Sequence, residues 1–245
     1  MRKTSKEVII YYSPFTAEDE QNWDVLHEPP TQVFNYLKSK RNPIKDDFNY
    51  LNCPATQNVQ KQTYRLVNTM QSHYKIENGE IFGVSKNYIS AARNREPSLK
   101  NQTLIVLAMK WIFFTEEESL KMTLLPPICE KAGHLQYGAA ITGSFDIGKY
   151  LRQITVEYNL WENVNEFKIE KDEPYAYVMF DTDLPIKLVR FVVSPKMKNY
   201  VDVMTRSTKW ERKIPLVARY ERFRRSQMKK LVLHEIKNNL IGEIE

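Results

Sequence analysis

Ile154-Thr-Val-Glu-Tyr-Asn-Leu160 is the stretch that decides the fold class of this chain. Apolar and polar residues alternate along it, so that Ile154, Val156, Tyr158 and Leu160 share one face. Successive side chains of a β-strand point to opposite faces of the sheet, and a half-buried strand shows this alternation. We therefore predict a strand over residues 153–161, with one face in a core.

Other strand patterns lie on both sides of this stretch. In residues 74–82, Asn78-Gly79 favours a type I′ hairpin turn, because both central residues of that turn need positive φ. Further strands are predicted at 103–114, 120–125, 174–180 and 186–193. We expect an acidic turn to join the first two of these, and the last two to form a hairpin. About eight short strands indicate a jelly-roll-like antiparallel β-sandwich rather than alternating βα units.

The chain divides into three zones. Residues 1–61 are polar and predict an N-terminal excursion with short helices, one of them over 32–40 with Thr31 as its cap. Residues 62–194 hold the predicted strands and form the β-sandwich domain. Residues 195–245 predict a C-terminal helical extension. The predicted fold class is α+β, mainly β.

Helix signals are clear in the last zone. Ser194-Pro195 places a capping hydroxyl before a proline at the first helical position, and the helix is expected to end near residue 208. A longer helix is predicted over 216–239. Its apolar residues at helical spacing are Met228, Leu231, Val232, Ile236 and Leu240. This apolar stripe must be covered by the sandwich or by another chain.

The positive charge of the chain is concentrated in residues 185–230, which contain fourteen Lys or Arg and three acidic residues. The densest part, and the predicted anion-binding or partner-binding set, is Arg219, Arg222, Arg224, Arg225, Lys229 and Lys230. Such a face can be solvated, bind a protein, or bind nucleic-acid phosphates in a salt-dependent way. Tyr200, Trp210, Tyr220 and Phe223 lie among these cations, as is common on nucleic-acid surfaces.

A second candidate is the loop at residues 143–153. Glycines at 143 and 148 bracket a phenylalanine, and Asp146, Lys149 and Arg152 recur at three-residue intervals. The loop can bind a ligand, with Arg152 as an anion contact. It can equally be a corner between strands, in which Asp146 caps backbone amides or pairs with Arg152.

Known catalytic and cofactor patterns were not found. The four histidines are scattered without further ligands at metal-binding spacing, and each is expected at the surface or in hydrogen-bonded packing. The seven glycines form no phosphate-binding loop, and no Gly-x-Ser-x-Gly elbow occurs. We expect no metal, no cofactor and no catalytic residue. The acidic pairs at 172–173 and 181–183 are expected to be solvated rather than to bind a cation.

The expected location follows from the apolar runs and the cysteines. The apolar runs are too short for a transmembrane span, and no membrane association is expected. The two cysteines predict no disulfide framework, which favours synthesis in a reducing cytoplasm.

Several short pieces of the sequence resemble a group of uncharacterised proteins of about this size that are encoded by tailed marine bacteriophages. These pieces are residues 9–15, 22–24, 52–54, 143–153 and 172–183. The resemblance implies a phage source and synthesis in the bacterial host cytoplasm. It implies no activity, cofactor or site residues.

Three functions are compatible with these features. The first is a non-enzymatic virion or accessory protein that binds a protein partner, or another copy of itself, through the basic helices. The second is a cupin-like enzyme or small-ligand binder that uses the interior of the sandwich. The third is non-specific nucleic-acid binding by the basic tract. We favour the first.

Overall fold

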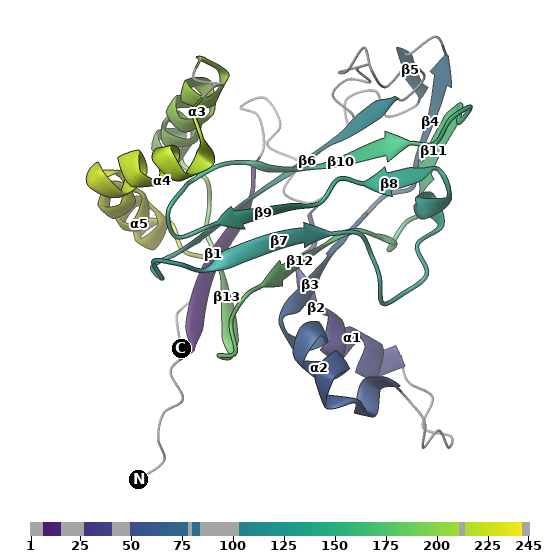
Figure 1. Cartoon of the computed structure of the whole chain (residues 1–245), viewed down its shortest axis with the longest axis horizontal. Helices are drawn as coiled ribbons and strands as arrows, with labels where there is room; N and C mark the ends of the chain where they lie inside the picture. Colours follow the sequence, from purple (N-terminus) through teal and green to yellow (C-terminus); the bar gives the residue numbers. More distant parts are fainter. Residues whose placement is uncertain are drawn as a thin grey trace.

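The computed structural model describes residues 7–15, 27–40, 50–77, 80–83, 103–210 and 214–241 (Figure 1). The strands form two five-stranded sheets and one three-stranded sheet. The predicted turn residues Asn78-Gly79 lie outside the described residues. The two strands that flank this turn do pair in antiparallel fashion, with Glu77 opposite Glu80, as a hairpin requires.

The first sheet has the order β13-β1-β6-β10-β8. Its strands are β13 (Ile186–Arg190), β1 (Val8–Pro14), β6 (Leu104–Thr115), β10 (Ile154–Leu160) and β8 (Gly138–Ala140). Residues of β10 are alternately buried and half-buried, as its sequence predicts. All pairs in this sheet are antiparallel except β1 with β13.

The second sheet has the order β2-β3-β12-β7-β9. Its strands are β2 (Thr31–Gln32), β3 (Thr63–Val67), β12 (Pro174–Phe180), β7 (Lys121–Leu125) and β9 (Gly143–Asp146). A smaller third sheet is formed by β11 (Glu166–Ile169), β4 (Ser72–Glu77) and β5 (Glu80–Gly83), in that order.

One hydrophobic core joins the first and second sheets. It contains the inward faces of β1, β6 and β10 from one sheet and of β3, β7 and β12 from the other. The rings of Phe113 and Phe180, one from each sheet, lie 5.8 Å apart in an edge-to-face arrangement. The predicted class is therefore confirmed: the fold is α+β and mainly β, with antiparallel sheets consistent with a β-sandwich and helices at the C-terminus.

The predicted hairpin of residues 174–180 and 186–193 is wrong. Strand β12 belongs to the second sheet, whereas β13 belongs to the first and pairs in parallel with β1, with Val8 opposite Ile186. The segment between β12 and β13 therefore crosses from one sheet to the other. The acidic turn after β6 makes a similar crossing, because β6 and β7 also lie in different sheets.

The N-terminal zone contributes to the sandwich as well as carrying short helices. These are α1 (Val33–Lys40), the 3-10 turn η2 (Tyr50–Asn52) and α2 (Pro54–Lys61); a second 3-10 turn, η4 (Gly133–Gln136), lies in the sandwich zone. The helix predicted over 32–40 begins at Val33, and Thr31 does not cap it, because Thr31 and Gln32 form strand β2 and the Thr31 hydroxyl donates to the Pro29 carbonyl. Strand β1 lies inside the first sheet, between β13 and β6. Residues 1–61 are thus more than an N-terminal excursion, because their strand β1 is part of the sandwich and pairs with strands from much later in the chain.

Three helices follow the last strand: α3 (Pro195–Trp210), α4 (Leu216–Arg225) and α5 (Met228–Asn238). The predicted start is confirmed, since the Ser194 hydroxyl accepts a hydrogen bond of 3.0 Å from the Met197 N–H. The single helix predicted over 216–239 is wrong. Ser226 has extended backbone angles that end α4, and its hydroxyl accepts a bond of 3.3 Å from the Met228 N–H at the start of α5.

The apolar sides of these helices pack against the chain's own first sheet. Phe223, Val232 and Ile236 are buried in a second core with Tyr11, Ile112 and Phe114, which lie on the outer face of β1 and β6. Leu231 of the predicted stripe is 42% exposed and lies at its edge. The stripe is therefore covered within the chain, and α3–α5 are docked against the sandwich.

Candidate interaction surface

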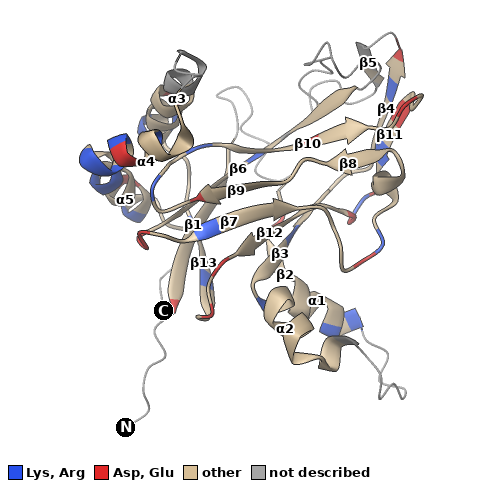
Figure 2. Cartoon of the chain, in the orientation of Figure 1, with Lys and Arg blue, Asp and Glu red and all other residues tan. Residues whose placement is uncertain are grey.

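The six predicted binding residues lie together at the junction of α4 and α5. Arg219, Arg222, Arg224 and Arg225 are on α4, and Lys229 and Lys230 are on α5; we call this set the cationic corner. Figure 2 shows these cations gathered on one side of the molecule. Residues 214–241 contain seven Lys or Arg and two Glu. The bend at Ser226 thus brings the end of one cationic helix next to the start of another.

Some of these cations bond to other parts of the same chain. The Lys229 ammonium donates to the Glu116 backbone carbonyl at 2.8 Å, and the neighbouring Lys237 forms an ion pair of 2.7 Å with the Glu116 carboxylate. The hydrogen bond from Lys237 holds the pKa of Glu116 below its usual value, although burial opposes this shift. Lys229 therefore ties α5 to the turn between β6 and β7, which the sequence did not reveal.

Four of the five remaining cations of the corner are exposed, whereas Arg219 is half-buried. Arg222, Arg224, Arg225 and Lys230 are exposed, and Arg224 pairs with Glu221 at 2.9 Å on the helix surface. An exposed pair of this kind contributes about 0–1 kcal/mol and leaves the guanidinium accessible. Within the described ranges, no ion pair is recorded for Arg225 or Lys230. These two side chains are the part of the cationic corner that is most open to a partner.

Residues 143–153 form a structural corner. The Asp146 carboxylate is buried, forms an ion pair of 2.9 Å with Lys149 and accepts a hydrogen bond from the Gly148 N–H at 3.3 Å. Arg152 instead places its guanidinium 4.9 Å from the centre of the Phe145 ring. Asp146 is therefore engaged within its own loop, and the three residues do not converge on one ligand position.

The loop at residues 143–153 lies against α4. The Asp146 backbone N–H donates to the Tyr220 hydroxyl at 3.0 Å. Burial raises the pKa of Tyr220, and the positive charge of Arg152 opposes that rise. Arg152 is thus close enough to α4 to add its charge to the edge of the cationic corner. The two candidate sites, separate in the sequence, adjoin in the fold.

Comparison with known proteins gives a single result. The chain matches no protein-family model, no curated protein and no solved structure. Its function is therefore inferred from its own surface and interior.

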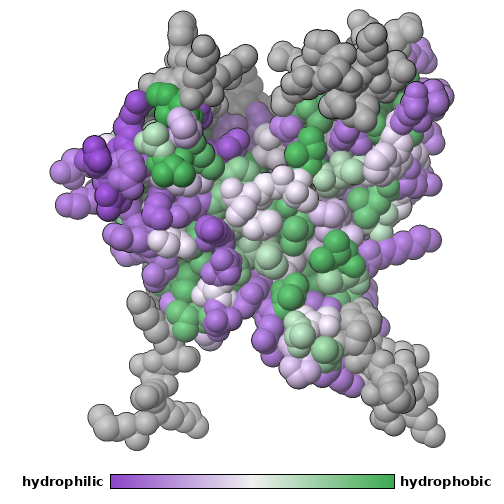
Figure 3. All heavy atoms as spheres, in the orientation of Figure 1, coloured by the Kyte–Doolittle hydropathy of each residue, from purple (hydrophilic) through white to green (hydrophobic). Residues whose placement is uncertain are grey.

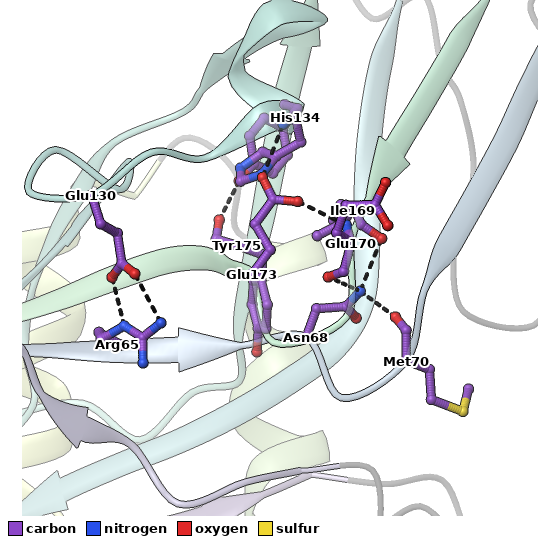
Figure 4. Close-up of polar contacts among 10 residues, drawn as sticks. Arg65, Asn68, Met70, Glu130, His134, Ile169, Glu170, Glu173 and Tyr175 are labelled. Carbon is purple, nitrogen blue, oxygen red and sulfur yellow. Dashed lines mark hydrogen bonds and ion pairs between the residues drawn. The ribbon is translucent and has the colours of Figure 1, made fainter. Parts of the chain in front are cut away.

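The interior contains a polar network that sequence reasoning missed (Figure 4). His134 is fully buried; its Nδ1 lies 2.9 Å from the Glu173 carboxylate and its Nε2 lies 2.9 Å from the Tyr158 hydroxyl. The Tyr158 hydroxyl also donates to the Tyr175 carbonyl, and the Trp111 indole N–H donates to the Tyr175 hydroxyl at 2.6 Å. Sequence spacing gave no signal, because these residues come from four separate segments.

Glu173 is the centre of this network, whereas we expected a solvated carboxylate at this position. Besides the His134 ring, its oxygens accept hydrogen bonds from the backbone N–H groups of His134 at 3.1 Å and Glu170 at 2.7 Å. Burial alone would raise the pKa of Glu173, but these hydrogen bonds outweigh it and hold the pKa below its usual value. Asp181 and Asp183 follow the opposite end of β12, so the acidic pairs at 172–173 and 181–183 do not meet.

A second buried ion pair holds the loop that precedes η4 on the second sheet. Arg65 makes two hydrogen bonds to the Glu130 carboxylate, at 2.5 and 2.9 Å (Figure 4). The Tyr177 hydroxyl donates to the same carboxylate at 2.7 Å. The Arg65 guanidinium also lies 3.4 Å from the centre of the Tyr36 ring on α1. These groups fix α1 and the loop against β3 and β12.

The polar atoms in both networks bond to one another. Among the described residues, no group of three or more His, Cys, Asp or Glu side chains is arranged to hold a metal ion. No described helix is both long and apolar enough to cross a membrane. The hydrogen bonds of the two networks join segments that are distant in the sequence and so hold the sheets and loops together.

Acidification is expected to destabilise the fold in two steps through this network. Burial lowers the pKa of His134 from its ordinary 6.5, although Glu173 opposes the shift. Below about pH 6.5 the unfolded chain therefore binds a proton that the folded chain does not, and stability falls. Glu173, with its lowered pKa, stabilises the fold fully above its ordinary pKa of 4.5, and this contribution is lost as the pH falls further.

The first step can be tested by urea unfolding across this pH range. His134→Gln is expected to flatten the dependence of the unfolding free energy on pH between about pH 5 and 7, because it removes the titrating imidazole. His73→Gln, at an exposed position, is the control and should leave the profile unchanged. A His134→Gln profile as steep as that of the parent protein would contradict the assignment.

Proposed function

We propose that this chain is a non-enzymatic, phage-encoded interaction protein that docks on an acidic protein surface through the cationic corner. It would act in the cytoplasm of the bacterial host or as part of the virion. The observation that carries this proposal is that α4 and α5 turn their apolar sides to the chain's own sheet and their exposed cations to solvent. The helices are therefore presented as a preformed cationic surface.

Exposed aliphatic side chains beside the cations favour a protein as the partner. On α4, Val217 is 70% exposed, one helical turn from Glu221 and two from Arg224. On α3, Val203 is 61% exposed. Figure 3 shows hydrophobic side chains over the region of α3 and α4, beside the hydrophilic end where α4 meets α5. Protein interfaces combine aliphatic contacts with a charged rim in this way.

The aromatic residues of the basic tract give little support to nucleic-acid binding. Phe223 is buried, Tyr220 bonds to Asp146, and Tyr200 packs against the second core. The side chain of Trp210 lies outside the described part of the structure. Stacking on bases needs exposed rings, and the described rings of this tract are turned inward.

Charge reversal at the two most open cations tests the proposal. Arg225→Glu/Lys230→Glu is expected to weaken binding to poly-L-glutamate, measured by fluorescence anisotropy at low salt, at least tenfold (about 1.4 kcal/mol). Lys131→Glu/Lys171→Glu makes the same charge change at exposed positions outside the corner and should retain much of the affinity. Equal losses in the two variants would contradict a localised site.

Two further measurements separate the alternatives. Tighter binding to duplex DNA than to poly-L-glutamate, with loss of affinity as salt rises, would favour the nucleic-acid function instead. Mass spectrometry of purified phage particles distinguishes a virion component from an accessory protein, since absence from the particles removes the virion version.

A further inference from the structure

A groove lies far from the cationic corner, between helices α1 and α2 and the segment that joins β12 to β13. Its volume is about 620 Å³, which falls within the range of small-ligand sites. Helices α1 and α2 lie on the opposite side of the molecule from α3–α5 (Figure 1). A ligand in this groove would therefore leave the cationic corner free.

Carboxamides dominate the polar lining. They come from two segments of the chain: Gln32 directly before α1 and Asn35 on it, and Asn58 on α2 and Gln62 at its end. Gln32 donates to the Lys61 carbonyl at 2.7 Å. Within the described residues, no side-chain hydrogen bond is recorded for Asn35, Asn58 or Gln62. Each carboxamide can donate two hydrogen bonds and also accept, so the groove offers donors and acceptors side by side.

The charges of the groove cancel. Lys61 and Asp183 are its ionisable residues, and their formal charges sum to zero. The Lys61 ammonium lies 5.1 Å from the centre of the Phe34 ring and 3.4 Å from the Gln57 side-chain oxygen, so it is already engaged. A phosphate or a carboxylate would find no surplus of positive charge here. The lining therefore suits a neutral ligand.

The rest of the lining is apolar: Phe34, Leu184, Pro185 and Ile186. A neutral ligand that fits this lining carries adjacent hydroxyls for the carboxamides and an apolar C–H face for these side chains. Both properties belong to a pyranose ring. A peptide that adds to a strand edge is matched less well, because most of this lining comes from helix and loop side chains.

We propose that this groove binds a neutral saccharide of two or three units, held by the carboxamides of Asn35, Asn58 and Gln62 over an apolar floor. The groove thus forms a second binding site, separate from the cationic corner in position and in ligand chemistry. Its contacts depend on neutral hydrogen bonds, so saccharide binding is expected to change little between low and moderate salt, unlike binding at the cationic corner.

The test is a titration of the isotope-labelled full chain with maltotriose, cellotriose and tri-N-acetylchitotriose, followed by NMR of the side-chain amide groups. At least one of these sugars is expected to shift the NH₂ signals of Asn35, Asn58 and Gln62 with a dissociation constant of about 1 mM. Asn35→Ala/Asn58→Ala should raise that constant at least tenfold. Both positions are exposed and helical, so alanine is compatible with the fold.

Asn199→Ala, at an exposed position of α3, is the matched control and should bind like the parent chain. If a tetra-alanine peptide shifted the same signals more strongly than any of the sugars, the ligand of the groove would be a peptide and not a saccharide. Absence of shifts with all three sugars, or unchanged affinity in Asn35→Ala/Asn58→Ala, would overturn the proposal.

Discussion

Glu173→Ala is expected to lower the free energy of unfolding by about 3–5 kcal/mol. The substitution removes the carboxylate that accepts hydrogen bonds from the His134 ring, the His134 N–H and the Glu170 N–H. Each buried donor left without a partner costs about 1–3 kcal/mol. The loss is large because the network joins the 3-10 turn η4 to the start of β12, and through Tyr158 to the middle of β10.

Urea denaturation followed by circular dichroism measures this change. Glu170→Ala is the matched control: the side chain of Glu170 is 54% exposed and pairs with Lys168 on the surface. The control should unfold at nearly the same urea concentration as the parent protein. If Glu173→Ala were as stable as Glu170→Ala, the network would be incidental to the fold.

Gly148→Ala is expected to cost about 3 kcal/mol or more. A Cβ atom at this position would lie 1.7 Å from the Glu117 carbonyl oxygen and 2.9 Å from its carbonyl carbon. Both are backbone atoms, so relief requires the loop at 143–153 and the turn after β6 to move apart. The same turn carries Glu116, which binds Lys229 and Lys237 of α5. We therefore also expect α5 to be cleaved faster by trypsin in this variant.

Gly133→Ala provides the control for this prediction. A Cβ atom at Gly133 would have its nearest neighbour, a Glu173 side-chain oxygen, at an ordinary contact distance of 3.6 Å. Its unfolding free energy is expected to stay within about 1 kcal/mol of the parent value. If the thermal unfolding curves of Gly148→Ala and Gly133→Ala coincided, the close contact at Gly148 would be relieved without a cost in stability, and the prediction would be wrong.

The cationic corner and the structural networks differ in how far they could be foreseen. The six cations were found from the sequence alone, because charge density is a local property. Their exposure could not be foreseen, since Lys229 contacts Glu116, which lies 113 residues away. Glu173 was misjudged for the same reason: its acidic neighbourhood suggested solvent, but its partner His134 is 39 residues away.

By itself, the sequence determined the local structure of this protein. The alternation at Ile154–Leu160 specified a half-buried strand, and Ser194-Pro195 specified the start of α3. The tertiary structure alone decided that β13 pairs with β1 rather than with β12, and that α4 ends at Ser226 with Phe223 buried against Phe114. Periodicity and capping act within a few residues of the chain. Sheet order and burial depend on packing between segments that are in places more than a hundred residues apart, and no local pattern encodes this packing.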